Sequence, residues 1–219
     1  MQENSEMLAS DIKKRHFYSG KKCGVGFKAS RCPLLSKHEI DESEWASNFY
    51  PAAFEIEGLI YRTSEHYFQS MRFRRGPSDE PLEIRLLRNE FSNIIRSSKT
   101  PNSAYKLAQY VSFTKKDGKP YVKIAFPSQN WIRDVIMDFY EKGLRKFEVN
   151  QSNDFEIMLA ANRVKFGQNP ILKAKLIETG TDELTEHTTR DNVWGDGGDG
   201  SGKNLLGSVL MQIRGEVST

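Results

Sequence analysis

The spacing of apolar and polar residues changes along the chain. Over residues 54–61 apolar positions alternate around Glu57-Gly58, which predicts a β-hairpin. Beyond the hairpin, apolar residues recur every three or four positions, the period of amphipathic helices. The predicted helices begin at Thr63 or Ser64 and at residues 78–81, and others cover residues 102–110, 129–147, 155–166 and 171–177.

The N-terminal part of the chain has a less regular pattern of apolar and polar residues. The polar segment 1–12 predicts a flexible N-terminus, and the run 12–18 predicts a strand that enters the domain. Residues 19–42 have no regular period and are interpreted as an insertion. The sequence therefore predicts one compact α+β domain over residues 13–219, mostly helical, with a small β-hairpin or sheet.

The segment 191–204 is the most distinctive part of the sequence. It contains five glycines, three carboxylates and one tryptophan, and apolar residues at helical spacing follow it directly. A glycine-rich turn before a helix start is a typical anion site, because free main-chain N–H groups and the helix dipole point the same way. The tryptophan adds a flat face for a base or sugar. The segment therefore suggests a nucleotide-like ligand with phosphates.

Three other interpretations of this segment are a P-loop, a calcium-binding loop and a surface loop without a ligand. Residues 197–203 fit the first part of a P-loop, but Asn204 stands where Ser or Thr should bind Mg²⁺. The preceding residues 184–190 are mostly polar, unlike the buried hydrophobic strand that leads into a P-loop. The aspartate spacing is not that of an EF-hand. A flexible surface loop rich in glycine and aspartate remains an alternative.

Composition and charge limit the class of protein. The 219 residues are 37% hydrophobic with a net charge of +3, and residues 60–119 hold twelve Lys/Arg against six Asp/Glu. This excess is compatible with a polyanionic partner or with a solvated basic face. We expect no signal peptide, no membrane span and no metal site. Cys23 and Cys32 could pair, but two thiols fit a reducing cytosol or nucleus better.

Glu65 is the strongest candidate for chemistry. It lies in the first turn of its predicted helix, where the dipole favours a carboxylate. Phe68, Gln69 and Arg72 follow at helical spacing on the same face. A carboxylate, an amide and a guanidinium on one face are plausible for a pocket wall. The alternative is a glutamate that only satisfies the helix dipole.

Five ordered motifs resemble the NADAR superfamily, also called YbiA-like. The resemblance covers about residues 13–217, and its hallmarks are the Ser-Glu-His-Tyr-Phe-Gln block at 64–69 and the Trp-Gly-Asp-Gly loop at 194–197. The other motifs are Ser47-Asn48-Phe49, Trp131 before a long helix, and Lys165-Phe166 with Gln168-Asn169. Tyr18, in Phe17-Tyr18, is similar to the usual opening of the family. Residues 148–156 look like a second insertion, and the family's Gly-Arg pattern is absent near residues 104–110.

The resemblance implies an N-glycosidase that acts on nucleotide-derived substrates without metal or cofactor. The first expectation is removal of ADP-ribose from the guanine amino group, which reverses nucleic-acid ADP-ribosylation. The alternatives are cleavage of ribosylated pyrimidine intermediates in riboflavin biosynthesis, or a non-catalytic ADP-ribose reader. DNA, RNA and small ribotides stay open as substrates. We expect a monomer in the cytoplasm or nucleus, with no membrane contact and with an ADP-ribose moiety and ADP-ribosylated nucleic acid as partners.

The resemblance also assigns roles to individual residues. Glu65 and Asp191 match catalytic positions. The expected substrate-binding residues are Tyr18, Asn48, Phe49, Gln69, Arg72, Trp131, Trp194, Gly195, Asp196, Gly197, Gly198, Lys203 and Asn204.

N-glycoside hydrolysis builds positive charge at the anomeric carbon, so a nearby carboxylate and a positioned water would promote it. We expect Glu65 to orient or deprotonate this water, and the loop with Arg72 to hold the pyrophosphate. A lysine that forms a Schiff base with the opened ribose is the second mechanism, with Lys28 and Lys203 as candidates.

Overall fold

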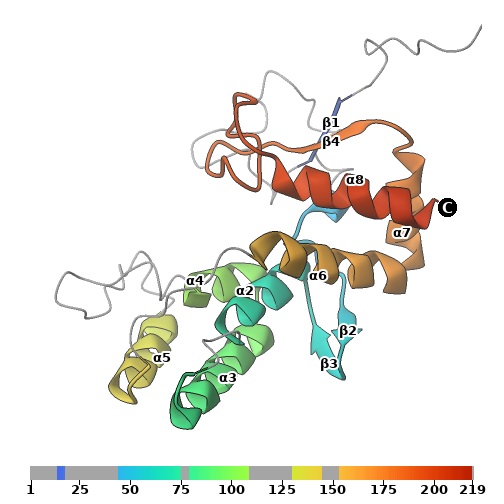
Figure 1. Ribbon diagram of the computed structural model, residues 1–219. Coiled ribbons are helices and arrows are strands. Elements are labelled where there is room, and N and C mark those ends of the chain that lie inside the picture. Colours follow the sequence, from blue (N-terminus) through green and yellow to red (C-terminus); the bar gives the residue numbers. More distant parts are fainter. Residues whose placement is uncertain (1–13, 18–43, 75–78, 109–129, 145–152, 219) are drawn as a thin grey trace, which may run out of the picture. The chain divides into compact units, whose positions relative to one another are not determined.

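The computed structural model describes residues 14–17, 44–74, 79–108, 130–144 and 153–218 (Figure 1). Its elements are β1 (Lys14–Phe17), η3 (Glu44–Ala46), β2 (Phe54–Ile56), β3 (Leu59–Tyr61), α2 (Ser64–Arg74), α3 (Leu82–Ser97), α4 (Pro101–Ala108), α5 (Asn130–Glu141), α6 (Asp154–Gln168), α7 (Pro170–Glu178), β4 (Glu183–Glu186) and α8 (Leu205–Val217). The α+β class, mostly helical with a small hairpin, is confirmed. The predicted insertion 19–42 lies entirely outside the described residues.

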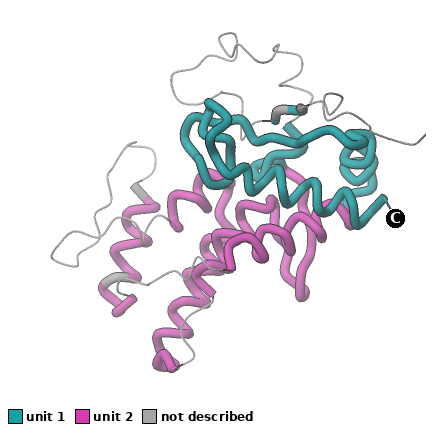
Figure 2. Tube along the Cα trace, turned by 45° about the horizontal axis from the view of Figure 1, so that its top comes forward, with its two compact units in different colours: residues 1–50, 169–219 teal, residues 51–168 magenta. Residues whose placement is uncertain are grey.

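The chain divides into two compact units (Figure 2). Residues 1–50 and 169–219 form unit 1, and residues 51–168 form unit 2. Unit 1 holds the glycine-rich segment, and unit 2 holds the helix that carries Glu65.

Unit 1 contains a two-stranded parallel sheet of β1 and β4, in which Phe17 pairs with Glu186. Helix α8 packs against β4, and α7 packs against α8 (Figure 1). Strand β4 was not predicted, because residues 184–190 are mostly polar. The polar side chains of Thr185 and Glu186 are buried in it. The hydrophobic pattern of a strand is therefore absent from a segment that nevertheless forms one.

Unit 2 is built around α2. This helix packs against α3, α4, α6 and β3. The hairpin of β2 and β3 is confirmed, with Glu57 and Gly58 both at positive φ in its turn. The amide of Gln168, at the end of α6, donates to the Glu55 carbonyl at 2.9 Å and accepts from the Glu55 N–H at 2.8 Å. This side chain acts as an extra pairing partner for β2.

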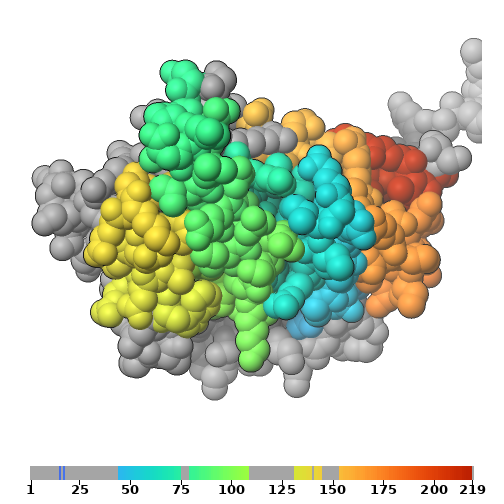
Figure 3. Space-filling model, turned by 90° about the horizontal axis from the view of Figure 1, so that it is seen from below, coloured from blue at the N-terminus to red at the C-terminus, as the bar shows by residue number. Residues whose placement is uncertain are grey.

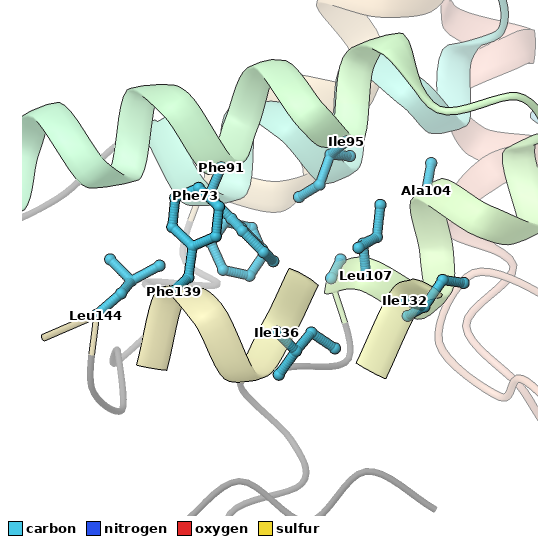
Figure 4. Close-up of a cluster of buried hydrophobic side chains, with 10 residues drawn as sticks. Phe73, Phe91, Ile95, Ala104, Leu107, Ile132, Ile136, Phe139 and Leu144 are labelled. Atoms are coloured by element: carbon cyan, nitrogen blue, oxygen red, sulfur yellow. The ribbon is translucent and has the colours of Figure 1, made fainter. Parts of the chain in front are cut away.

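A cluster of buried apolar residues joins α2, α3, α4 and α5 (Figure 4). Phe91 contacts two other phenylalanines of the cluster, with its ring centroid 4.9 Å from that of Phe73 and 5.1 Å from that of Phe139. In Figure 3, α5 (yellow), α3 and α4 (green) and the hairpin (cyan) cover one face of the unit. These helices are held together mainly by apolar burial.

Two helix boundaries differ from the prediction. Helix α5 ends at Glu141, not at residue 147, because Gly143 turns the chain with a φ of 102°. The helix predicted to begin at residues 78–81 is α3, which begins at Leu82, directly after Pro81. The predicted helix over 102–110 is α4, whose last described residue is Ala108.

Candidate active-site residues

Helix α2 begins with a side-chain cap. The Thr63 hydroxyl oxygen accepts from the His66 main-chain N–H at 3.3 Å and lies 2.8 Å from His66 Nδ1. His66 Nε2 lies 3.1 Å from the Ser98 carbonyl oxygen, which can only accept, so Nε2 carries the ring proton. Burial lowers the pKa of His66, so this ring stays neutral inside the fold. The cap fixes the first turn of α2, where Glu65 lies.

The predicted common face of α2 is confirmed. Glu65 is 5% exposed, and its Oε1 accepts a hydrogen bond of 2.7 Å from Gln69 Nε2. Arg72 Nη1 donates to Gln69 Oε1 at 3.4 Å, and its guanidinium lies 5.4 Å from the centre of the Phe68 ring. The helix therefore brings a carboxylate, an amide and a guanidinium into one line, as its residue spacing predicted.

Arg72 also forms an ion pair with Asp154, a partner that sequence spacing did not indicate. Its Nε lies 3.5 Å from Asp154 Oδ1 on α6, although neither atom has a hydrogen-bond partner. Burial raises the pKa of Asp154, and the charge of Arg72 opposes this in part. Arg72 thus belongs to an internal charge pair and not only to a surface that could meet phosphate.

Lys165 is a candidate that the sequence analysis did not select. It lies on α6, is fully buried, and has its Nζ 5.1 Å from the centre of the Phe166 ring. Burial lowers its pKa to about 7. One turn earlier on α6, Asn162 Oδ1 accepts from the Ser64 hydroxyl at 3.0 Å, next to Glu65 in the chain. A signal was present, since Met158, Ala161 and Lys165 share one helical stripe that is apolar up to the lysine.

In unit 1, the glycine-rich segment forms a loop closed by its own hydrogen bonds. The first two main-chain N–H groups of α8, in Leu205 and Leu206, donate to the carbonyls of Val193 and Trp194, both at 3.1 Å. The Lys203 N–H donates to the Asn192 carbonyl at 2.8 Å. The expectation that the start of α8 offers free N–H groups to phosphate is therefore wrong for Leu205 and Leu206.

Two aspartates organise this loop. Asp191 Oδ1 accepts from the N–H groups of Val193 and Trp194, both at 2.8 Å. Asp196 is buried, and it accepts from two main-chain N–H groups and from His187 Nδ1, which lies 2.7 Å from its Oδ2. Burial acts to raise the pKa of Asp196, but these hydrogen bonds outweigh it and lower the pKa. His187 is a second buried polar residue that the sequence analysis did not select.

The glycines are required by the loop itself. Gly197 and Gly198 have φ values of 74° and 84°, in the region that favours glycine. A Cβ added to Gly202 would lie 2.4 Å from the Gly195 carbonyl oxygen, and one added to Gly195 would lie 2.4 Å from the Thr188 side chain. The glycine content therefore has a structural explanation that needs no ligand.

Asn204 connects the loop to the sheet. Its Nδ2 donates to the Leu184 carbonyl at 2.9 Å, and its Oδ1 accepts from the Glu186 N–H at 2.9 Å. The residue itself has a left-handed φ of 49°, which Asn tolerates better than most residues. At this position a P-loop has Ser or Thr for Mg²⁺. Here the Asn204 side chain instead pairs with the main chain of β4.

The remaining predicted residues have varied environments. Asn48 is buried and Phe49 is half-buried, in a turn where the Phe49 N–H donates to the Ser47 hydroxyl at 3.1 Å. Trp131, on α5, is 40% exposed, and among the described contacts none joins it to Glu65. Lys203 is exposed, and Trp194 is half-buried. Tyr18 and Lys28 lie outside the described residues.

Two kinds of feature are absent from the described residues. None of the helices there has the length and apolar character needed to cross a membrane. Nor do the described residues contain a group of three or more His, Cys, Asp or Glu side chains arranged to hold a metal ion.

The chain is similar to the protein YbiA over most of its length. It is 31% identical to N-glycosidase YbiA of Escherichia coli (strain K12) over 172 residues, which cover 78% of this chain and 80% of that protein. The solution structure of the E. coli protein YbiA matches with a TM-score of 0.54 at 30% identity, covering 81% of this chain and 80% of that one.

A second relative is much longer than this chain. The riboflavin biosynthesis protein VVA0006 of Vibrio vulnificus (strain YJ016) is 31% identical over 181 residues, which are 82% of this chain but 37% of that protein. The family model described as NADAR domain matches residues 35–218, which include both the Glu65 helix and the glycine-rich loop. This chain therefore belongs to the NADAR domain family.

Proposed function

We propose that this protein is an N-glycosidase that hydrolyses the bond between ADP-ribose and the amino group of guanine. The coarser part of this proposal, hydrolysis of an N-glycosyl bond, is supported by relatives named N-glycosidase in E. coli and in Acanthamoeba polyphaga mimivirus. The observation that carries it is Glu65, a buried carboxylate in the first turn of α2 with a hydrogen bond from Gln69.

The proposed role of Glu65 follows from the positive charge that develops on the sugar during hydrolysis. As the glycosidic bond breaks, positive charge grows on the anomeric carbon and the ring oxygen, and the guanine nitrogen needs a proton. A carboxylate that is largely removed from bulk water stabilises this cation more strongly than an exposed one, because solvent screens it less. In this mechanism Glu65 stabilises the cation and accepts a proton from the attacking water. The guanine nitrogen takes up one proton from solvent as it leaves, and Glu65 returns its proton to solvent, so that in sum one water is divided between ADP-ribose and guanine.

The loop of unit 1 has the binding role. Because the first N–H groups of α8 are engaged, we assign recognition to side chains: Trp194 stacks on a base and Lys203 meets the pyrophosphate. Asp191, proposed from the family resemblance to assist at the ribose, already holds the turn at Trp194. Asp191 therefore affects catalysis at least through the position of Trp194.

A lysine nucleophile remains the second mechanism, and the structure adds Lys165 to its candidates. An amine with a pKa of about 7 is partly uncharged at neutral pH, as Schiff-base formation requires. Borohydride added during turnover would reduce such an imine and leave ADP-ribose attached to the lysine, detectable by mass spectrometry. A trapped adduct would replace the water mechanism, and its absence supports the carboxylate mechanism.

The relatives with riboflavin names favour a second candidate substrate, the ribosylated pyrimidine intermediate of riboflavin biosynthesis. We expect release of ADP-ribose from an oligonucleotide that carries ADP-ribose on guanine, and no release of ribose phosphate from the pyrimidine ribotide. Chromatography of both reactions measures this directly. Turnover of the ribotide alone would show that the second candidate is the substrate. If neither substrate is turned over and ADP-ribose causes no thermal shift, the protein would be a scaffold that binds no nucleotide.

A further inference from the structure

A line of polar side chains runs along α2 and ends on α6. Gln69 Nε2 donates to Glu65 Oε1 at 2.7 Å, Arg72 Nη1 donates to Gln69 Oε1 at 3.4 Å, and Arg72 Nε lies 3.5 Å from Asp154 Oδ1. Glu65 and Gln69 are buried, and the side chains of Arg72 and Asp154 are 18% and 17% exposed. Low exposure makes each of these contacts stronger than it would be in water.

The direction of this line is fixed at Arg72. A guanidinium only donates hydrogen bonds, so the Gln69 atom that faces it must be the carbonyl oxygen. The Gln69 NH₂ group then has to face Glu65, and it requires an acceptor there. Glu65 Oε1 can accept this bond in either state of the carboxyl group, but the ionised carboxylate is the stronger acceptor, so the bond from Gln69 favours the deprotonated state. The Phe68 ring adds a cation–π contact to Arg72, since the guanidinium lies 5.4 Å from the ring centre.

We propose that Gln69 and Arg72 are positioning residues that keep the Glu65 carboxylate deprotonated and correctly oriented, and that Asp154 anchors Arg72 from α6. The proposal rests on the proposed function, since it supplies the state of Glu65 that hydrolysis needs. It changes the role of Arg72 from a pyrophosphate ligand to a support for the carboxylate.

Several other titratable groups lie on the elements that pack against α2. The buried or half-buried titratable groups on the described elements packed against α2 are Asp154 and Lys165 on α6, Arg88 and Arg96 on α3, Lys106 on α4 and Tyr61 on β3. Arg88 is held by Glu80, with Nε to carboxylate distances of 2.6 and 2.8 Å, and Arg96 donates to the Ile60 carbonyl at 3.3 Å. Among these described groups, Asp154 lies within ion-pair distance of Arg72.

The first experiment measures kcat/KM against pH on guanine-ADP-ribosylated oligonucleotide for wild type and Arg72→Met. Without the guanidinium the Gln69 amide can flip, and Glu65 then takes up a proton more easily. We expect the acid limb of the profile to move upward by about one pH unit, so that the loss is large at low pH and small at high pH. Arg72→Lys, which keeps a donor, should recover part of the shift.

The matched control is Arg85→Met, which changes an exposed arginine of α3 outside this line. Its acid limb should coincide with that of wild type. If Arg72 instead binds pyrophosphate, Arg72→Met raises KM equally at every pH and leaves the limb unmoved, which would overturn the proposal.

A second experiment does not depend on the substrate. The carboxyl carbons of ¹³C-labelled glutamates are titrated by NMR in the free protein, with the Glu65 signal assigned by its loss in Glu65→Gln. Arg72→Met and Gln69→Glu should both move the Glu65 midpoint upward, the latter because two adjacent carboxylates compete for one proton. Unchanged midpoints in folded variants refute the positioning role. A shift in a protein that fails to cleave the oligonucleotide keeps this inference and rejects only the proposed substrate.

Discussion

The amino group of Lys165 is enclosed by the fold, and burial lowers its pKa to about 7. A free lysine titrates near 10.4, so between these values the unfolded chain binds the proton and the folded chain does not. The free energy of unfolding therefore rises with pH across this window, and the contribution is fully unfavourable below pH 7. A residue with this effect on stability is a candidate for function more than for structure.

Lys165→Met tests this account of stability. Because methionine needs no desolvation of charge, the variant should unfold with a free energy higher by a few kcal/mol at pH 7, at about 1.4 kcal/mol per pKa unit. The advantage should shrink steadily toward pH 10. Urea unfolding at pH 6, 8 and 10 measures it, with the exposed Lys175→Met as control. A difference that does not vary with pH would contradict the burial of a titrating amine.

Single residues also show which parts of the site the sequence could predict. The contacts of Glu65, Gln69 and Arg72 follow from helical spacing, because residues three and four positions apart meet on one helix face. Asp154 could not be predicted in this way, since it reaches Arg72 only through the packing of α6 on α2. Lys165 continues an apolar stripe of α6, which is a signal in the sequence, but its complete burial follows only from tertiary packing.

At the scale of elements, two amide side chains complete the edges of short strands. Asn204 pairs with the main chain of β4, and Gln168 pairs with the main chain of β2. A strand of three or four residues has few ladder hydrogen bonds, so a side chain that adds two of them is a substantial support. Both residues belong to family motifs, and their roles here are structural.

The packing of α8 on β4 depends on one glycine. A Cβ at Gly207 would lie 2.0 Å from the Leu184 carbonyl oxygen, whereas a Cβ at Gly215, in the same helix, meets nothing within 4 Å. We expect Gly207→Ala to reduce the free energy of unfolding by about 3 kcal/mol or more, because the main chain must move. Gly215→Ala should raise it by up to about 1 kcal/mol through helix propensity. Urea unfolding compares them, and equal effects would contradict the contact.

The elements that the sequence predicted correctly have local causes. The hairpin follows from the turn chemistry of Glu57-Gly58, and α2 follows from its Thr63 cap. Strand β4 was missed because its stability comes from distant partners, β1 and Asn204, which allow buried polar side chains where periodicity expects apolar ones. The end of α5 was placed too late because apolar spacing continues past Gly143 in the sequence.

At the scale of the whole molecule, the family assignment and the chemistry of Glu65 support one proposal. The excess of Lys and Arg over residues 60–119 is weaker support for a nucleic-acid partner than it first suggests. Arg62 and Arg96 donate to the carbonyls of Ser98 and Ile60, and Arg88 is buried against Glu80. These three arginines hold unit 2 together, so a nucleic-acid substrate has to be tested by turnover and not inferred from charge.

The most direct test compares Glu65→Gln with wild type on an oligonucleotide that carries ADP-ribose on guanine. The amide keeps the size of the side chain but removes its charge and its basicity, so kcat should fall by about 100-fold or more. ADP-ribose affinity, measured by calorimetry, should stay within a few-fold of wild type. Turnover equal to that of wild type, in a variant that folds and binds ADP-ribose, would remove Glu65 from the reaction and contradict the proposed mechanism.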